Sequence, residues 1–465
     1  MNAIALEIGK ILIILYLLDM HDMIYCTPLS RIIKKDEAMT LQNAVQQAYE
    51  SFLKYSDGHQ VVLLHPQSRL RSVLIAQLFK DSNTKTFYYA LGENDTNLQS
   101  FIESFAHDMS TQHPTFGRHL YMLPYQLHQN FAADVDRVLD AMVLEISELS
   151  DDPFVLILDE YDRSDNANDI NRFVEYLADR LPAHCKLIIN SRTMPRLPWL
   201  SMVAKNQAII LKDDVLITSD IYGPHTYDKY NLEISALGPG FVTLNGEPVD
   251  SWEGHLPRLL LFYALDRPVV TRAEICGAFW PNLDMDQAVN VFHVTKRRLH
   301  KALDLDVLLH TENYYQINPE LTVYYDVVDF VETLVKGRYA EGEEQFEAWQ
   351  RVIDLYNGPF LQGHDEVWIL DRQEAMRTGY IEAVTGMAKT WQERGKGETA
   401  LKLYRSAIDE AYDREDVHRA VIALYNDLGR RGEAAAHYQQ LEKAYKVQGK
   451  KLSNQTIDMY NKIMS

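Results

Sequence analysis

The sequence has little cysteine and no excess of positive charge. Its three cysteines, Cys26, Cys185 and Cys276, are an odd number and form no CxxC pair, so neither a disulfide framework nor a metal site is supported. The formal net charge is -20, which argues against a basic coat for non-specific attachment to nucleic acid or membranes. Any contact with DNA therefore has to be local. The scarcity of cysteine fits a cytoplasmic protein.

Long apolar runs are also missing. The run at residues 11–18 follows Lys10 as in a signal peptide, but it falls far short of the roughly 20 residues of a membrane span. A small-x-small cleavage pattern is absent before Cys26. We therefore interpret residues 1–40 as a helical, apolar N-terminal segment that is buried or faces a partner, and we expect no membrane association.

Four short apolar runs alternate with helical patterns between residues 41 and 212. This alternation is typical of a parallel sheet covered by helices. The runs are Val61–Leu64, Phe87–Ala90, Phe154–Leu158 and Lys186–Ile189.

Two of these runs end where a nucleotide-hydrolysing enzyme holds its catalytic groups. A phosphate loop, G-x-x-x-x-G-K-[ST], needs glycines so that backbone N–H groups can wrap the phosphates, and a lysine for the β/γ charge. Here those positions are His65, Leu70 and Arg71, and only Ser72 fits the pattern. Asp159-Glu160 after the third run match a Walker B pair.

The stretch from Leu187 to Pro198, which contains Arg192, resembles the sensor strand of the signal-transduction ATPases in LuxR-type and maltose-regulator-type activators. The resemblance covers residues 45–212 and implies descent from an ATPase switch. Because the phosphate loop is degraded, we interpret the domain as a degenerate P-loop scaffold with no catalytic residues and no cofactor. ATP and Mg²⁺, if bound, would meet Arg71, Ser72, Asp159, Glu160 and Arg192.

After the linker at 213–230, the sequence pattern changes from alternating strands and helices to a hairpin followed by three helices. Phe241–Leu244 leads into Asn245-Gly246, a two-residue hairpin signal. A helix is predicted at His255–Leu265, and a second at Arg272–Phe279 with Thr271 and Glu274 as a capping box. A third follows at Asp286–Leu303.

The third helix has one apolar and one basic face. Ala288, Phe292, Thr295, Leu299 and Leu303 share the face that should be buried. The other residues from 287 to 301 include four cations and no acid, as a major-groove recognition helix requires. A solvated basic face serving an acidic neighbouring domain is the alternative. The candidate DNA contacts on this helix are Gln287, Asn290, His293, Val294, Lys296, Arg297, Arg298 and Lys301.

Two short strands, Val307–Thr311 and Tyr314–Ile317, follow the basic helix and predict a wing. Together with Phe279-Trp280-Pro281, this order resembles the response-regulator-type winged helix of the bacterial antibiotic regulatory protein family. The resemblance implies DNA binding, with Asn313 and Tyr314 at the wing. Tyr314 departs from the family, which usually has glycine there.

From residue 326 onward the pattern is helical and repeats every 34 residues, the period of tetratricopeptide repeats. Gly395 and Gly429 form one such pair, and Tyr404 and Tyr438 another. The segment resembles the bacterial transcriptional activator domain that follows the winged helix in the same family.

The predicted fold is multidomain α/β plus α: a degenerate P-loop-type parallel domain (41–212), a winged helix-turn-helix domain (231–325) and an α-helical TPR-like domain (326–465). The predicted function is sequence-specific binding of double-stranded DNA by a transcriptional regulator, an activator, without enzymatic activity. RNA polymerase and a second copy of the chain are further expected partners. Two alternatives stay open: an ATP-dependent switch, and a TPR adaptor.

Overall fold

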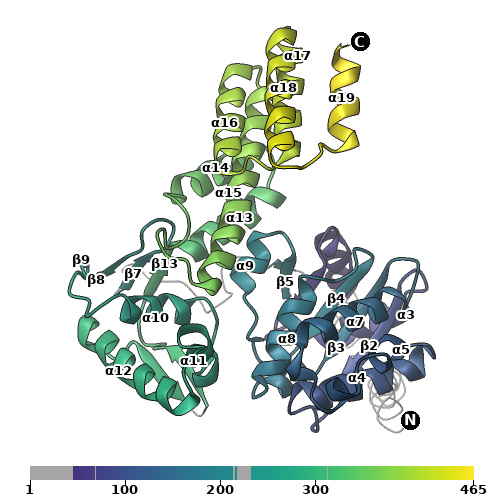
Figure 1. Ribbon diagram of the computed structural model, residues 1–465, viewed down its shortest axis with the longest axis vertical. Coiled ribbons are helices and arrows are strands. Elements are labelled where there is room, and N and C mark those ends of the chain that lie inside the picture. The colour runs from purple at the N-terminus through teal and green to yellow at the C-terminus, as the bar shows by residue number, and fades with distance from the viewer. Residues whose placement is uncertain (1–44, 69, 213–214, 217–231, 312, 465) are drawn as a thin grey trace, which may run out of the picture. The chain divides into compact units, whose positions relative to one another are not determined.

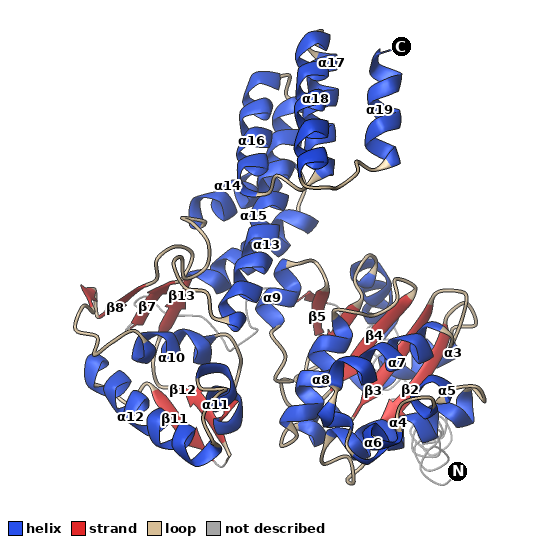
Figure 2. Ribbon diagram, in the orientation of Figure 1, coloured by secondary structure: helices blue, strands red, loops and turns tan. Residues whose placement is uncertain are grey.

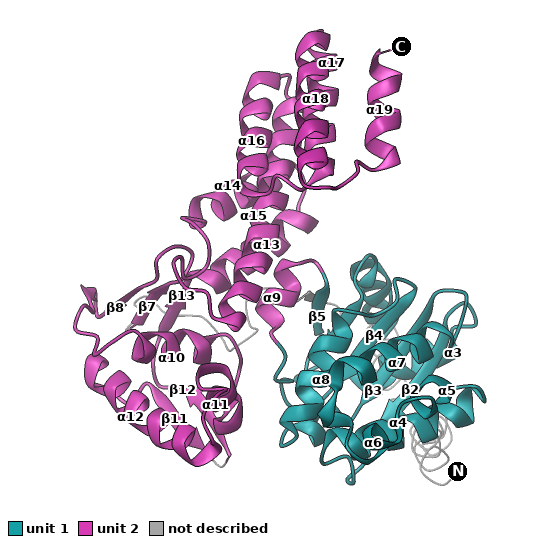
Figure 3. Cartoon of the chain, in the orientation of Figure 1, with its two compact units in different colours: residues 1–197, 207–217 teal, residues 198–206, 218–465 magenta. Residues whose placement is uncertain are grey.

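The computed structural model describes residues 45–68, 70–212, 215–216, 232–311 and 313–464. The predicted segment 1–40 and nearly all of the linker 213–230 lie outside the described residues. The chain forms two compact units, one of residues 1–197 and 207–217, the other of residues 198–206 and 218–465 (Figure 3). Among the described helices, none has the length and hydropathy that a membrane span requires.

The first unit is built on a six-stranded sheet in the order β2-β3-β4-β1-β5-β6, parallel except for β6 (Figure 1). The four predicted strands are confirmed, and their neighbours are in register, as in the pairing of Val61 with Leu187. The strands are β1 (Val61–Leu64), β2 (Lys85–Ala90), β3 (Phe154–Asp159), β4 (Cys185–Asn190), β5 (Ala208–Lys212) and β6 (Val215–Leu216).

Helices cover both faces of this sheet. On one face, Phe52 of a helix at 45–56 and Leu74 of α3 (Arg71–Lys80) pack on alternate strand residues such as Ile157. On the other, Tyr89 contacts Phe105 of α4 (Leu98–Gln112) edge to face. The remaining helices are α5 (Arg118–Tyr121), α6 (Tyr125–Gln129), η1 (Phe131–Ala133), α7 (Val135–Ser147), η2 (Tyr161–Ser164) and α8 (Asn168–Ala178).

Beyond residue 231, the second unit starts with a winged helix (Figure 2). Strands β7, β8 and β9 precede three helices, and β13, which follows the wing in the chain, completes their four-stranded sheet in the order β13-β7-β8-β9. A three-stranded sheet, β10-β12-β11, carries the wing. Asn245 and Gly246 both have positive φ, as the predicted type I′ turn requires. The elements are β7 (Leu232–Ser235), β8 (Phe241–Leu244), β9 (Glu247–Pro248), α10 (Leu256–Leu265), β10 (Val270–Thr271), α11 (Arg272–Phe279), α12 (Met285–Leu303), β11 (Leu308–Thr311), β12 (Tyr314–Ile317) and β13 (Val323–Tyr325).

The rest of the second unit is helical. Gly395 and Gly429 end their helices at φ +71° and +72°, and Tyr404 and Tyr438 are both buried in one core cluster; the predicted repeat is therefore seen in the backbone. The helices are α13 (Asp326–Tyr339), α14 (Gly342–Leu355), α15 (Val367–Glu393), α16 (Gly397–Glu410), α17 (Glu415–Asp427), α18 (Arg431–Val447) and α19 (Asn454–Met464).

The winged helix and the helical repeats share buried contacts. Asp326 at the start of α13 accepts backbone N–H bonds from Ala236 and Leu237. Trp368 of α15 packs edge to face on Tyr263 of α10, with ring centroids 5.2 Å apart. The winged helix is thus anchored on the repeats through buried contacts.

A short helix, α9 (Trp199–Ala204), also belongs to the second unit. All six of its residues are buried. The Arg338 guanidinium of α13 donates to the carbonyl oxygens of Val203 (2.6 Å) and Ala204 (2.8 Å) and pairs with Glu382. The Val203 carbonyl also accepts from the Asn206 N–H, so Arg338 adds side-chain donors at a helix end, where carbonyls have few intrahelical partners.

Candidate nucleic-acid interface and a degenerate nucleotide site

Helix α12 is held by one buried stripe and one cap. The Asp284 side chain accepts a hydrogen bond from the Gln287 backbone N–H at 2.9 Å and so caps the N-terminus. The buried residues are the five that the helical period predicts: Ala288, Phe292, Thr295, Leu299 and Leu303. The opposite face is consequently exposed.

The helix before it, α11, is fixed by the predicted capping box. The Thr271 hydroxyl accepts from the Glu274 N–H, and the Glu274 carboxylate accepts from the Thr271 N–H at 2.7 Å. This reciprocal pair satisfies two donors at the helix start.

The predicted DNA contacts lie on the outer side of α12. The half-buried Lys296 stands near its edge, with its ammonium 5.4 Å from the Tyr315 ring centroid. The seven others are exposed: Gln287, Asn290, His293, Val294, Arg297, Arg298 and Lys301. The structure therefore brings the predicted contacts of this helix together on one surface.

A carboxylate that the sequence did not single out stands at the C-terminal end of this surface. Glu253, in the loop before α10, accepts a hydrogen bond from Lys301 and lies 3.4 Å from Arg298 Nε. These cations lower the pKa of Glu253, with Lys301 the larger influence. Two of the predicted DNA contacts are therefore already paired with an acid.

The wing is held against α12 by an aromatic cluster. Tyr315 of β12 is buried and meets Phe292 edge to face, with centroids 4.9 Å apart. Asn313 is exposed at the tip and Tyr314 is half-buried beside it. Both predicted wing residues follow the anchored strand β11 at the hairpin turn.

The local field on α12 is strongly positive. Burial, together with the charges of Arg272, Lys296 and Arg297, lowers the pKa of His293. Burial and Lys296 likewise lower the pKa of His300, whose Nε2 accepts from the Leu308 N–H while Nδ1 faces Asp306. Burial is the larger cause of both shifts, and the neighbouring cations add to it.

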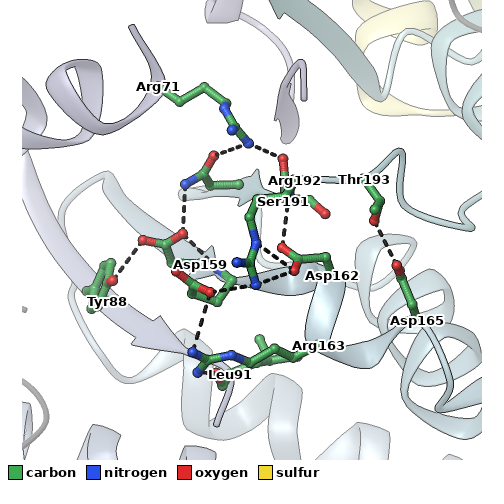
Figure 4. A network of polar contacts seen from close by, with 12 residues as sticks. Arg71, Tyr88, Leu91, Asp159, Asp162, Arg163, Asp165, Ser191, Arg192 and Thr193 are labelled. Atoms are coloured by element: carbon green, nitrogen blue, oxygen red, sulfur yellow. Dashed lines mark hydrogen bonds and ion pairs between the residues drawn. The ribbon is translucent and has the colours of Figure 1, made fainter. Parts of the chain in front are cut away.

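The predicted nucleotide residues lie in the first unit, after the carboxyl ends of β1, β3 and β4. Figure 4 shows Arg71, Asp159 and Arg192 among them. Arg71 reaches across from the start of α3 and donates to the Ser191 carbonyl and, at 3.4 Å, to Asn190 Oδ1. Ser72 is exposed on the first turn of α3. The guanidinium thus joins the loop after β1 to the end of β4.

Asp159 is surrounded by donors. Its Oδ2 accepts from the Tyr88 hydroxyl at 2.8 Å (Figure 4) and its Oδ1 from Asn190 Nδ2 at 2.7 Å. The backbone N–H of Glu160 also donates to Oδ1 at 2.7 Å. The carboxylate that a Walker B site would offer to Mg²⁺ is used here to bind neighbouring strands together.

The other two candidates form a separate ion-pair cluster. Arg192 Nη2 lies 3.2 Å from Glu160 Oε2 and 2.7 Å from Asp162 Oδ2. Burial raises the pKa of Asp162, but its bonds with Arg192 outweigh this and leave it lowered. The charges of Arg192 and Glu160, which a nucleotide site would direct at its ligand, are thus paired with each other.

Sequence reasoning missed Asn190, which connects Arg71 to Asp159. The signal was present, because a polar residue that ends a buried parallel strand lies at the same sheet edge as the ends of its neighbours. Glu253 left no such signal, since its pairing with α12 depends on how a loop 48 residues earlier in the chain folds back.

Two family models match parts of the chain. Residues 325–464 match the model described as the bacterial transcriptional activator domain, and residues 47–192 match the model of the nephrocystin 3 N-terminal region. No curated protein matches the chain.

Two solved structures are similar in part. One is EmbR of Mycobacterium tuberculosis in complex with a low-affinity phosphopeptide, at 20% identity over 51% of this chain, with a TM-score of 0.43. The match covers 65% of the EmbR chain. The other is a Walker-type ATPase of Pyrococcus abyssi, at 9% identity over 90% of this chain and 87% of that one, with a TM-score of 0.23. The C-terminal part of the chain, residues 325–464, is a bacterial transcriptional activator domain.

Proposed function

We propose that this protein is a transcription activator that binds double-stranded DNA sequence-specifically through α12. The observation that carries the proposal is the exposed surface of α12. It gathers four cations and two amide side chains, Gln287 and Asn290, on the outer side of a helix whose other side is buried. Arginine and amide side chains are the groups that read guanine and adenine edges in the major groove.

Each exposed side chain of α12 is assigned to bases or to phosphates by its chemistry and its position on the helix. Arg297 and Asn290 are assigned to base edges, and Lys301, Lys296 and Arg298 to phosphates, where their charge gives affinity without sequence information. Asn313 and Tyr314 approach the adjoining backbone from the wing. RNA polymerase and a second copy of the chain are the partners we assign to the helical repeats, in the cytoplasm.

The nucleotide-type unit acts in this proposal as a scaffold. Arg71, Asp159 and Arg192 are bonded to neighbouring protein groups, and the phosphate loop has His65 and Leu70 in place of glycine. DNA binding should therefore need no nucleotide. An ATP-driven switch is the rival.

The test is recovery of genomic DNA fragments by the purified full-length protein, with and without ATP and Mg²⁺. Recovery of defined sites in both conditions is the expected result. Recovery only with ATP would favour the switch, and recovery of no defined site would overturn the proposal.

A further inference from the structure

The outer surface of α12 carries two apolar side chains among its polar ones. Val294 is 43% exposed and Val291 36% exposed. They are three positions apart, so they are neighbours on the helix surface. A β-branched residue lowers helix propensity, and each of the two residues keeps more than a third of its surface exposed, so local folding does not account for the exposed part of this pair.

The surroundings of the pair identify the kind of partner. Val294 is one helical turn from Asn290, Arg297 and Arg298, and no acid occurs between residues 287 and 301. An apolar protein surface would have to strip water from these cations. A DNA major groove neutralises them with phosphates, and it also presents apolar groups, the 5-methyl groups of thymine.

We infer that Val294, with Val291 beside it, is a specificity-determining residue that packs on thymine methyl groups in the major groove. The inference rests on the proposed function and adds the base that this part of the helix reads. The operator should carry thymine between the bases met by Asn290 and Arg297, which are about 10 Å apart along the helix.

Replacement of thymine by uracil isolates this contact, because it removes the methyl group and keeps every hydrogen-bonding edge of the base. Burial of one methyl group corresponds to about a fourfold change in affinity. Shortening Val294 to alanine removes the protein side of the same contact. Because the side chain is exposed, the variant should fold as the parent does.

The experiment uses the full-length protein and a duplex selected from random DNA, with uracil placed at each thymine in turn. The parent protein should lose about fourfold in affinity at one or two thymines. V294A should bind the thymine duplex about fourfold more weakly and lose no more at that uracil, so that the two changes are not additive. V447A, at an 81% exposed valine in α18, is the matched control and should behave as the parent.

Each other outcome is decisive. Indifference of the parent to uracil at every position overturns the inference while leaving the proposed function standing, as does a full uracil penalty in V294A. A change in oligomeric state of V294A by sedimentation, with no uracil effect, would instead assign the valines to a protein interface. Failure to select any duplex contradicts the proposed function itself and the inference with it.

Discussion

Glu253 and Lys301 form an ion pair across the surface that we assign to DNA, and Arg298 shares the same carboxylate. All three side chains are about half exposed or more. The pair therefore contributes little to folding, but it neutralises cations that DNA phosphates would otherwise meet.

Replacing Glu253 by glutamine should strengthen DNA binding. Exposed ion pairs are worth less than about 1 kcal/mol, so we expect a gain of two- to fivefold at low salt and a steeper dependence of affinity on salt. Fluorescence anisotropy over a salt series measures both. E233Q removes an exposed acid from β7 and is the control for net charge. Equal gains in affinity in the two variants would mean that the effect comes from net charge and not from the pairing of Glu253 with Lys301.

The buried pair of Arg372 and Asp266 should hold the winged helix on the repeats. Arg372 of α15 donates from Nε to Asp266 Oδ2 at 2.7 Å, and both side chains are at most 5% exposed. R372M removes the guanidinium that pairs with this buried carboxylate and should cost about 3–5 kcal/mol, measured by urea unfolding. The double variant R372M/D266L should recover part of this loss. An unchanged unfolding curve for R372M would contradict the account.

Acid should destabilise the helical repeats through His418 and His437. The His418 Nε2 faces the Tyr412 carbonyl at 3.0 Å, so it carries the proton, and Nδ1 accepts from His437 Nε2 at 2.9 Å. Burial lowers the pKa of both rings, that of His437 to about 4. A second proton on His418, at Nδ1, would place its N–H directly opposite the N–H of His437 Nε2, and the hydrogen bond between the rings would be lost.

Because the folded pKa values are lowered, this stability is present above the unfolded pKa of about 6.5 and is lost as pH falls toward 4. The expected loss is on the order of 1–3 kcal/mol, seen in unfolding curves at stepwise pH. H437Q should flatten the change over that window. If the free energy of unfolding of H437Q depended on pH as that of the parent does, the histidine pair would not be the cause of the acid sensitivity.

Nucleotide should leave the protein's melting temperature unchanged. A ligand present at 100 times its Kd stabilises a protein by about 2.7 kcal/mol, so even modest binding of Mg²⁺ and ATP would show. Restoring the loop with H65G/L70G/R71K should permit binding. Saturable ATP binding by the parent chain would contradict the scaffold proposal.

Local features of the fold followed from the sequence, whereas long-range pairings did not. The period of α12, the capping box of Thr271 and the glycine turns depend on neighbours in the chain, and the structure confirms them. The pairing of Arg372 with Asp266 joins residues 106 positions apart, and no local pattern encodes it. The strand β13 was missed for the same reason, since it exists by parallel pairing with β7.

The candidate DNA surface was predicted as a set of residues on one helix. The period alone placed their exposed face correctly, because the buried stripe fixes it. The partners of those residues could not be predicted: Glu253 comes from a loop, and the cation–π contact of Lys296 needs the wing tyrosine Tyr315 in place.

The most direct measurement is the affinity of the full-length protein for its selected duplex, compared with the R297A/K301A variant. Both side chains are exposed, so folding should be unaffected. K402A/K443A removes two exposed cations from the repeats and is the matched control. The account predicts a loss of at least tenfold for R297A/K301A, on the order of one base contact and one phosphate contact, and none for the control. Equal affinity of all three proteins would show that α12 is not the DNA-binding element.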